Sequence, residues 1–179
     1  LLWGMAVYLW GWGAGRVLAF PVGFLLFGLG LYRGLLSSVG FALQEVTAQG
    51  AALLAQGIGL GIIRDGLVLR SDAFAFIVAE ACSGMSSLLS LLALAALWTH
   101  LAEGSFGARL LTIASVAPLV ILANILRVTL VLLVAAWFGQ EAALGFFHGA
   151  SSLVLFGVAL GGLLLVSWRA GCKAPRFVV

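Results

Sequence analysis

Three side chains that lie far apart in the sequence could together carry out acyl transfer. Cys82 occupies the centre of a Glu-Ala-Cys-Ser-Gly segment, residues 80–84, which directly precedes a long apolar run. Asn124 and Arg127 interrupt a later hydrophobic segment, and His148 opens the last one. Cysteine, arginine and histidine can supply a nucleophile, a stabiliser of negative charge and a proton carrier.

Cys82 stands where a thiol can be reactive. A cysteine in an apolar bundle usually packs as a small hydrophobic side chain, but Cys82 precedes a helix instead of lying within one. A helix N-terminus or a nearby positive charge lowers the pKa of a thiol and favours the nucleophilic thiolate. Glu80 would raise that pKa unless its carboxylate pairs with Arg127 or binds substrate.

The other two polar residues also need an explanation. An arginine inside a hydrophobic helix is costly, so Arg127 should face a partner, a polar cavity or the membrane interface. It could snorkel or fasten the bundle, but Asn124 lies three residues earlier on the same helix face, which favours a shared site. His148 could be an interfacial residue or a general acid and base. The complementary roles of the three residues favour one catalytic site.

The composition is that of a membrane protein. Of 179 residues, 64% are hydrophobic and 8% are charged, and the mean hydropathy is +1.23. We therefore predict an all-α polytopic membrane bundle that forms a single domain over residues 1–179. The net charge of +3 comes from scattered arginines and gives no nucleic-acid footprint. Leu1 opens inside an apolar stretch, so we expect further sequence before it. Neither histidine lies in a His-Glu-x-x-His pattern, and we expect no metal or cofactor.

About five spanning helices are expected from the apolar stretches. They are residues 1–12, 17–32, 86–101, 110–138 and 148–168. A Gly-rich turn that ends at Arg16 separates the first two spans, and a polar connection with His100, Glu103 and Arg109 separates the third from the fourth. Paired glycines in the last span, Gly157 and Gly161, predict close helix packing.

Two further elements are expected outside the spans. Polar and apolar residues alternate irregularly over residues 41–56, which indicates an amphipathic helix along the membrane interface. Asp65-Gly66 between two short apolar runs predicts a β-hairpin, followed by alternating large and small residues over 74–78. This small extracytoplasmic β-element would deliver Cys82 to a strand-to-helix turn, for which Ser83 and Gly84 are suited.

The distribution of basic residues predicts the orientation in the membrane. Those expected inside are Arg16, Arg109, Arg169, Lys173 and Arg176. Those expected outside are Arg33, Arg64 and Arg70. This arrangement places Cys82, Arg127 and His148 at the outer face. Cys172 falls on the opposite side from Cys82, so we expect no disulfide between them and no role for the Cys172 thiol.

The ordered motifs resemble those of the exosortase and archaeosortase family, which are membrane cysteine transpeptidases. The matching pieces are Glu-Ala-Cys-Ser-Gly at 80–84, Ala-Asn-Ile-Leu-Arg-Val at 123–128, His-Gly at 148–149 and Phe-Pro-Val-Gly-Phe-Leu-Leu-Phe at 20–27. Their order and spacing agree over nearly the whole chain. The chain departs from many members after the cysteine motif, where Gly-Met-Ser-Ser at 84–87 replaces a Gly-Leu-Arg type of sequence.

The resemblance implies an activity and a place for it. The enzyme would cleave the C-terminal sorting signal of a secreted protein, such as a Pro-Glu-Pro motif followed by a hydrophobic helix and a basic tail. Cys82 would form a thioester acyl-enzyme, His148 would act as general acid and base, and Arg127 would steady the oxyanion or the substrate backbone. The residues expected to support the site or bind substrate are Glu80, Ser83, Gly84 and Asn124. The protein would be a multi-pass protein of the inner (plasma) membrane, with lipids and the sorting signal as partners and the active site outside.

Other readings of the same residues stay open. A transporter or scaffold could use Asn124 and Arg127 to bind an anionic solute or a partner helix. A serine protease could pair Ser151 or Ser152 with His148, although no Gly-x-Ser-x-Gly elbow surrounds any serine. Within the transpeptidase reading, the acyl acceptor could be water, a lipid or an amine.

Overall fold

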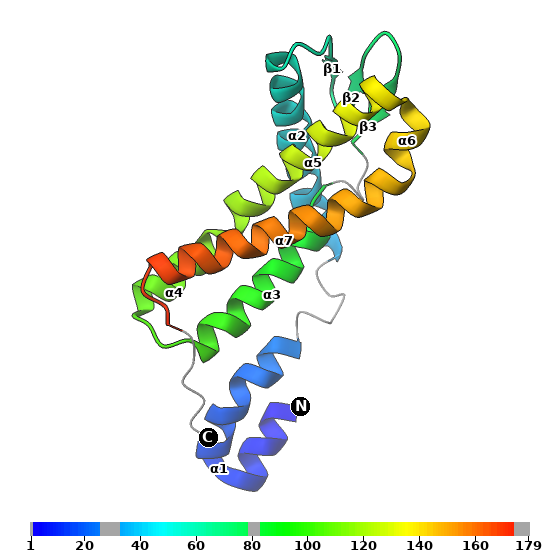
Figure 1. Ribbon diagram of the computed structural model, residues 1–179. Coiled ribbons are helices and arrows are strands. Elements are labelled where there is room, and N and C mark those ends of the chain that lie inside the picture. The colour runs from blue at the N-terminus through cyan, green and yellow to red at the C-terminus, as the bar shows by residue number, and fades with distance from the viewer. Residues whose placement is uncertain (1, 26–32, 79–82, 174–179) are drawn as a thin grey trace. The chain divides into compact units, whose positions relative to one another are not determined.

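The computed structural model describes residues 2–25, 33–78 and 83–173. The chain divides into two compact units, Leu1–Leu35 and Leu36–Val179, which we describe separately. Figure 1 shows the elements of both units.

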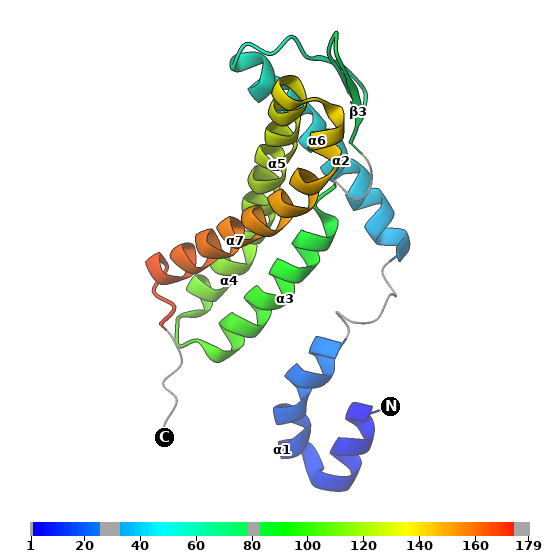
Figure 2. The same cartoon turned by 45° about the vertical axis from the view of Figure 1, so that its right-hand side comes forward.

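The first unit consists of helix α1 (Leu2–Phe24), which is broken at Gly11. Gly11 has φ 78° and ψ 179°, a conformation open to glycine but strained for other residues. The indole Nε1 of Trp3 donates a 2.7 Å hydrogen bond to the carbonyl of Gly15, although in a straight helix these residues would lie about 18 Å apart. The helix therefore folds back on itself, as Figure 2 shows. The predicted turn ending at Arg16 is wrong, because the break falls at Gly11 and Arg16 is helical.

Helix α2 (Arg33–Gly57) covers the predicted amphipathic segment and extends it at its start. Its buried residues are small or polar: Gln44, Thr47, Ala48, Ala51, Ala52 and Ala55. Its large apolar side chains face outward, with Phe41 58% and Leu53 61% exposed. Small residues inside and large apolar residues outside are typical of helices packed in lipid, where burial of apolar surface drives no association between helices.

The predicted hairpin is present and gains a third strand. Strands β1 (Ile63–Asp65), β2 (Val68–Arg70) and β3 (Ala75–Ile77) form an antiparallel sheet in the order β1-β2-β3. Asp65 pairs with Val68, so the turn residues are Gly66 and Leu67, one position later than the predicted pair. Gly66 has φ 60°, the positive value that a type II′ turn requires at its first central residue.

The alternation over residues 74–78 is also confirmed. Phe74 and Val78 are buried and Ile77 is 68% exposed, so one face of β3 joins the core. This core cluster contains the alanine face of α2, residues of the sheet and the second half of α5. The sheet therefore packs on the helices next to the chain segment that leads to Cys82.

Five helices complete the second unit. They are α3 (Met85–Leu101), α4 (Phe106–Ala114), α5 (Val116–Phe138), α6 (Gln140–Leu144) and α7 (Phe146–Arg169). Helices α3, α5 and α7 share a second core cluster that includes Leu91, Val120 and Leu163. Trp98 of α3 donates a 2.8 Å hydrogen bond to the hydroxyl of Ser167 on α7, which joins these helices near their C-terminal ends.

The number of spanning helices expected from the sequence is not confirmed. Among the described residues, two helical segments are long and apolar enough to cross a membrane, Phe106–Phe138 and Ala150–Arg169. The first contains both α4 and α5, with a bend at Ser115 between them. Helix α3 is apolar but shorter, at 17 residues.

The connection between α3 and α4 is shorter than predicted. His100 belongs to α3, and Arg109 lies in α4, where its Nη2 donates a 3.1 Å hydrogen bond to the carbonyl of Ala102. Glu103 pairs by backbone hydrogen bonds with Lys173, the residue after Cys172. Cys172 is a free thiol that is 3% exposed, so it is a packed residue of the core and not part of an open tail.

The glycines at close helix contacts differ from those predicted. A Cβ added at Gly157 or Gly161 would meet no heavy atom within 4 Å in the structure. A Cβ at Gly162 would lie 3.0 Å from Leu119 of α5, and one at Gly50 of α2 would lie 2.5 Å from Ile125. Gly162 of α7 and Gly50 of α2 therefore each approach α5 closely.

Candidate active site

Several of the residues predicted to do chemistry fall outside the described part of the chain. Cys82 and Glu80 lie in the segment 79–82, which is not among the described residues. The backbone of His148 lies in the first turn of α7, as the sequence predicted, but its side chain is outside the description. The described part of the site consists of the residues that flank these positions, together with Asn124 and Arg127.

Ser83 and Gly84 form the turn that leads from the cysteine motif into α3. Gly84 is the N-cap of α3 and has φ 79° and ψ 4°, a left-handed conformation that favours glycine. The hydroxyl of Ser83, which is buried, accepts a 3.2 Å hydrogen bond from the backbone N–H of Met85. The carbonyl of Gly84 accepts a bond from the N–H of Leu88. Both residues thus serve to start α3, immediately after Cys82 in the chain.

Asn124 lies against this turn. A Cβ added at Gly84 would lie 3.1 Å from Cγ and 3.2 Å from Nδ2 of Asn124, so the turn and the amide are in close contact. Asn124 is 6% exposed, and its Nδ2 donates a 3.1 Å hydrogen bond to the hydroxyl of Thr47 on α2. The amide therefore sits between α2 and the turn that follows Cys82.

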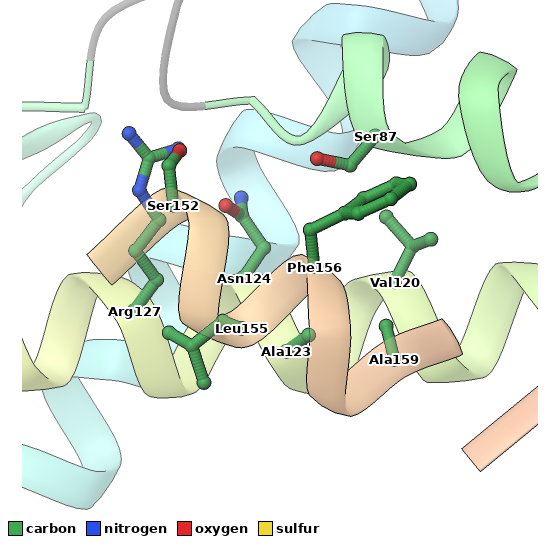
Figure 3. Close-up of a pocket in the computed structure, with 9 residues that line it drawn as sticks. All are labelled: Ser87, Val120, Ala123, Asn124, Arg127, Ser152, Leu155, Phe156 and Ala159. Carbon is green, nitrogen blue, oxygen red and sulfur yellow. The ribbon is translucent and has the colours of Figure 1, made fainter. Parts of the chain in front are cut away.

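Arg127 shares the face of α5 that carries Asn124, as the spacing predicted. Both residues line a pocket with an empty volume of about 300 Å³. Figure 3 shows Arg127, Asn124 and Ser152 on one side of the pocket and Ser87, Phe156 and Val120 on the other. Arg127 is half-buried, and Figure 3 shows its guanidinium close to Ser152.

The walls of this pocket come from three helices. Ser87 belongs to the first turn of α3, a few residues after Cys82, and Ser152 lies one turn after His148 on α7. Asn124 and Arg127 belong to the middle of α5. Segments that are remote in sequence, each adjacent to one of the predicted catalytic residues, therefore meet at a single pocket.

A second hollow adjoins the first. Ser87, Ser152 and Phe156 line both, and the second also has Ser86, Ser90 and Leu153 on its walls, with an empty volume of about 620 Å³. It lies between the first half of α3 and the first half of α7. Hydroxyl groups gather here on helices whose other outward residues, such as Val154 and Val158, are apolar and exposed.

The chemistry open to the pocket follows from these groups. A guanidinium and an amide can donate hydrogen bonds to an oxyanion or to a peptide backbone. Among the residues that the structure describes, no three His, Cys, Asp or Glu side chains are grouped so that they could hold a metal ion.

Reasoning from the sequence did not identify Thr47, Ser87 or Ser152 as parts of this site. Thr47 falls in the segment 41–56 that was expected along the membrane interface, Ser87 directly follows the residue at which the third span was expected to begin, and Ser152 was considered for a serine protease. Serines at the starts of two apolar helices were a usable signal for the pocket walls. No pattern in the sequence links Thr47 to Asn124, which is 77 residues away.

The fold and the pocket together define a helical membrane protein with an open pocket between apolar helices, whose polar lining residues are Ser87, Asn124, Arg127 and Ser152. A family model described as transmembrane exosortase (Exosortase_EpsH) matches residues 1–165, and the chain belongs to this family. Neither the curated proteins nor the solved structures contain a match to the chain. The resemblance inferred from the cysteine, arginine and histidine motifs is thereby confirmed at the level of the family.

Proposed function

We propose that this chain is a membrane cysteine transpeptidase or protease that cleaves the C-terminal sorting signals of secreted proteins. Membership of the transmembrane exosortase family supports a membrane transpeptidase role. The observation that carries the proposal to particular residues is the contact of Asn124 with Gly84. It joins the polar face of α5, which carries Arg127, to the turn that directly follows Cys82.

In the proposed reaction, the thiolate of Cys82 attacks the carbonyl carbon of the scissile peptide bond. His148 takes the thiol proton and returns it to the leaving amine, so that a thioester forms and the C-terminal tail departs. Arg127 stabilises the oxyanion of the tetrahedral intermediate, and Asn124 supports the site. Water, a lipid or an amine then attacks the thioester and releases the cysteine.

The hollow beside the pocket suits the approach of the substrate. The proposed signal ends in a hydrophobic helix, which would lie along the first halves of α3 and α7. Ser86 and Ser90 would offer hydroxyl groups to its backbone near the cleaved bond, since hydroxyl groups on membrane helices commonly make such interhelical bonds. The pocket with Arg127 shares a wall with this hollow, so a bound helix could present its N-terminal end to the catalytic groups.

The proposed location is the plasma membrane, with the pocket open to the extracytoplasmic side. Helix α4 and the C-terminal end of α7 lie toward one end of the second unit, and the sheet lies toward the other (Figures 1 and 2). The first end carries Arg109, Arg169 and Lys173, which pairs with Glu103 between α3 and α4, whereas the sheet carries Arg64 and Arg70. Three basic residues against two support the α4 side as cytoplasmic.

Replacement of Cys82 tests the proposal. A reporter protein ending in a Pro-Glu-Pro motif, a hydrophobic helix and a basic tail would be produced together with the chain, and cleavage would be followed by mass on a gel. Cys82→Ala and Cys82→Ser should reach the membrane in normal amounts but leave the reporter uncleaved. Cys172→Ala is the matched control and should cleave it, because Cys172 is buried outside the pocket.

Two results would reject the cysteine mechanism. The first is normal cleavage of the reporter by Cys82→Ala. The second is loss of that cleavage when Ser152→Ala is added to Cys82→Ala, which would indicate a serine hydrolase. A membrane-impermeant maleimide separates the enzyme from a transporter. It should modify Cys82 from outside the cell and abolish cleavage, whereas solute uptake by a transporter using Arg127 would tolerate the modification.

A further inference from the structure

Thr47 differs from the other buried threonines in what its hydroxyl contacts. The hydroxyls of Thr99, Thr112 and Thr129 each donate to the carbonyl four residues earlier in their own helix, and that of Thr112 also lies 4.0 Å from the sulfur of Cys172. The hydroxyl of Thr47 accepts a 3.1 Å hydrogen bond from Nδ2 of Asn124, on another helix. Thr47 is 1% exposed, so this bond is shielded from water and lipid headgroups.

The packing of α2 against α5 is built for this short contact. Gly50 lies one turn after Thr47, and a Cβ there would come within 2.5 Å of Ile125, the neighbour of Asn124. The absence of a side chain at Gly50 lets the two helices approach until a threonine hydroxyl reaches the amide. With a larger residue at position 50, the helices would separate and the hydrogen bond would lengthen.

The bond also determines how Asn124 is turned. An amide group has a donor end and an acceptor end, and donation to Thr47 commits Nδ2 toward α2. The same side chain is also in contact with Gly84, two residues after Cys82 in the chain, since a Cβ placed there would lie 3.2 Å from Nδ2 and 3.4 Å from Cβ of Asn124. Removal of the Thr47 hydroxyl would take away the bond that holds Nδ2 toward α2, and a shift of the amide would be felt by the turn that it contacts.

We infer that Thr47 is a positioning residue for the reaction, which acts by fixing Asn124 against the Ser83–Gly84 turn that follows the proposed nucleophile in the chain. This inference rests on the proposed function of Cys82. Thr47 itself lines neither hollow and touches no reacting atom in this scheme. Its role is to hold the Gly84 turn at one distance from the face of α5 that presents Arg127.

The test compares three single variants. Thr47→Val keeps the shape of the side chain but removes the acceptor, and Thr47→Ser keeps the hydroxyl. Thr129→Val is the matched control, because Thr129 is also buried and lies on α5. The hydrogen bond that the structure gives for its hydroxyl goes to the carbonyl of Ile125 in its own helix. Each variant would be measured for reporter cleavage and for the rate of alkylation of Cys82 by iodoacetamide across pH, followed by mass spectrometry at that residue.

We expect Thr47→Val to cleave the reporter roughly ten to a hundred times more slowly, since small displacements of catalytic groups have effects of that size. Under the proposed function Cys82 acts beside Arg127 and the N-terminus of α3, so loss of that position should move the midpoint of its alkylation profile up toward about 8.5, the value of a free thiol. Thr47→Ser and Thr129→Val should stay within about threefold of the parent in cleavage.

The inference would be overturned if Thr47→Val matched Thr129→Val in both measurements, or if Thr47→Ser failed to restore the parent values. If Thr47→Val fails to accumulate in the membrane, Thr47→Ala removes the same acceptor without adding bulk and is judged by the same two readouts. Failure of the proposed function would look different. Cys82→Ser would then cleave the reporter, while the alkylation profiles of the Thr47 variants would still decide whether Thr47 positions the turn.

Discussion

Gly84→Ala should separate the two reasons for a glycine at the start of α3. The first reason is the backbone, because φ 79° costs a residue with a Cβ about 1–2 kcal/mol. The second is space, because the new Cβ would lie 3.1 Å from Cγ of Asn124, closer than ordinary contact. Asn124 must then shift, and its buried bond to Thr47 weakens, which adds about 1 kcal/mol.

Gly59→Ala provides a matched control for the backbone term alone. Gly59 has φ 91°, but a Cβ there would meet no heavy atom within 4 Å in the structure. Its replacement should lower the melting temperature by about 2–8 °C, and Gly84→Ala by about 2–4 °C more, at about 2–4 °C per kcal/mol for a chain of this size. Both melting temperatures would be measured by tryptophan fluorescence of the purified protein in detergent.

The two variants should differ most in activity. Gly59→Ala should cleave the reporter at close to the parent rate at permissive temperature. Gly84→Ala should lose at least about tenfold, because a rise of only 1.4 kcal/mol in the barrier is sufficient for that loss. Equal cleavage by the two variants would refute the reasoning, since it would show that the contact between the turn and Asn124 has no bearing on the chemistry.

Three further predictions concern the pocket and the packing around it. Arg127→Lys should lower cleavage of the reporter by about 100-fold or more, because lysine keeps the charge but loses the planar fork of donors; cleavage at the parent rate would make Arg127 a structural residue. Gly50→Ala should destabilise the protein by about 1–3 kcal/mol through the clash with Ile125. Addition of Ile125→Ala should recover part of that loss, as measured by thermal unfolding. Strictly additive effects of the two substitutions would contradict the contact. Cys172 should resist maleimide in the folded protein and react after denaturation, as read by mass spectrometry; rapid labelling of the native protein would contradict its burial.

Patterns that depend on neighbours in the sequence were predicted well. Period-two alternation placed Phe74 and Val78 on the buried face of β3, and a turn glycine beside Asp65 marked the hairpin, with the turn itself one residue later. The start of α3 after Gly84 was correct to within one residue. The spacing of Asn124 and Arg127 placed them on one helix face, and the structure finds both in one pocket.

Features that depend on packing between helices were predicted poorly. The break of α1 at Gly11 was missed, because several glycines lie close together and the contact of Trp3 with Gly15 singles out one of them. The pair Gly157 and Gly161 was expected at a close helix contact, but the close contacts involve Gly50 and Gly162. Spacing within one helix shows which residues share a face but not which face meets a neighbour.

The sequence by itself determined the membrane class, the family and the set of residues that could act on a peptide bond, because composition and ordered motifs are properties of the chain alone. The tertiary structure decided which face of α2 is buried. Thr47 and the alanines of residues 48–55 are buried and Gly50 approaches Ile125 of α5, while Phe41 and Leu53 are exposed, because small side chains allow two helices to approach closely. This packing brings Thr47 into contact with Asn124, and Asn124 is in contact with Gly84. Residue spacing in the sequence predicts neither contact.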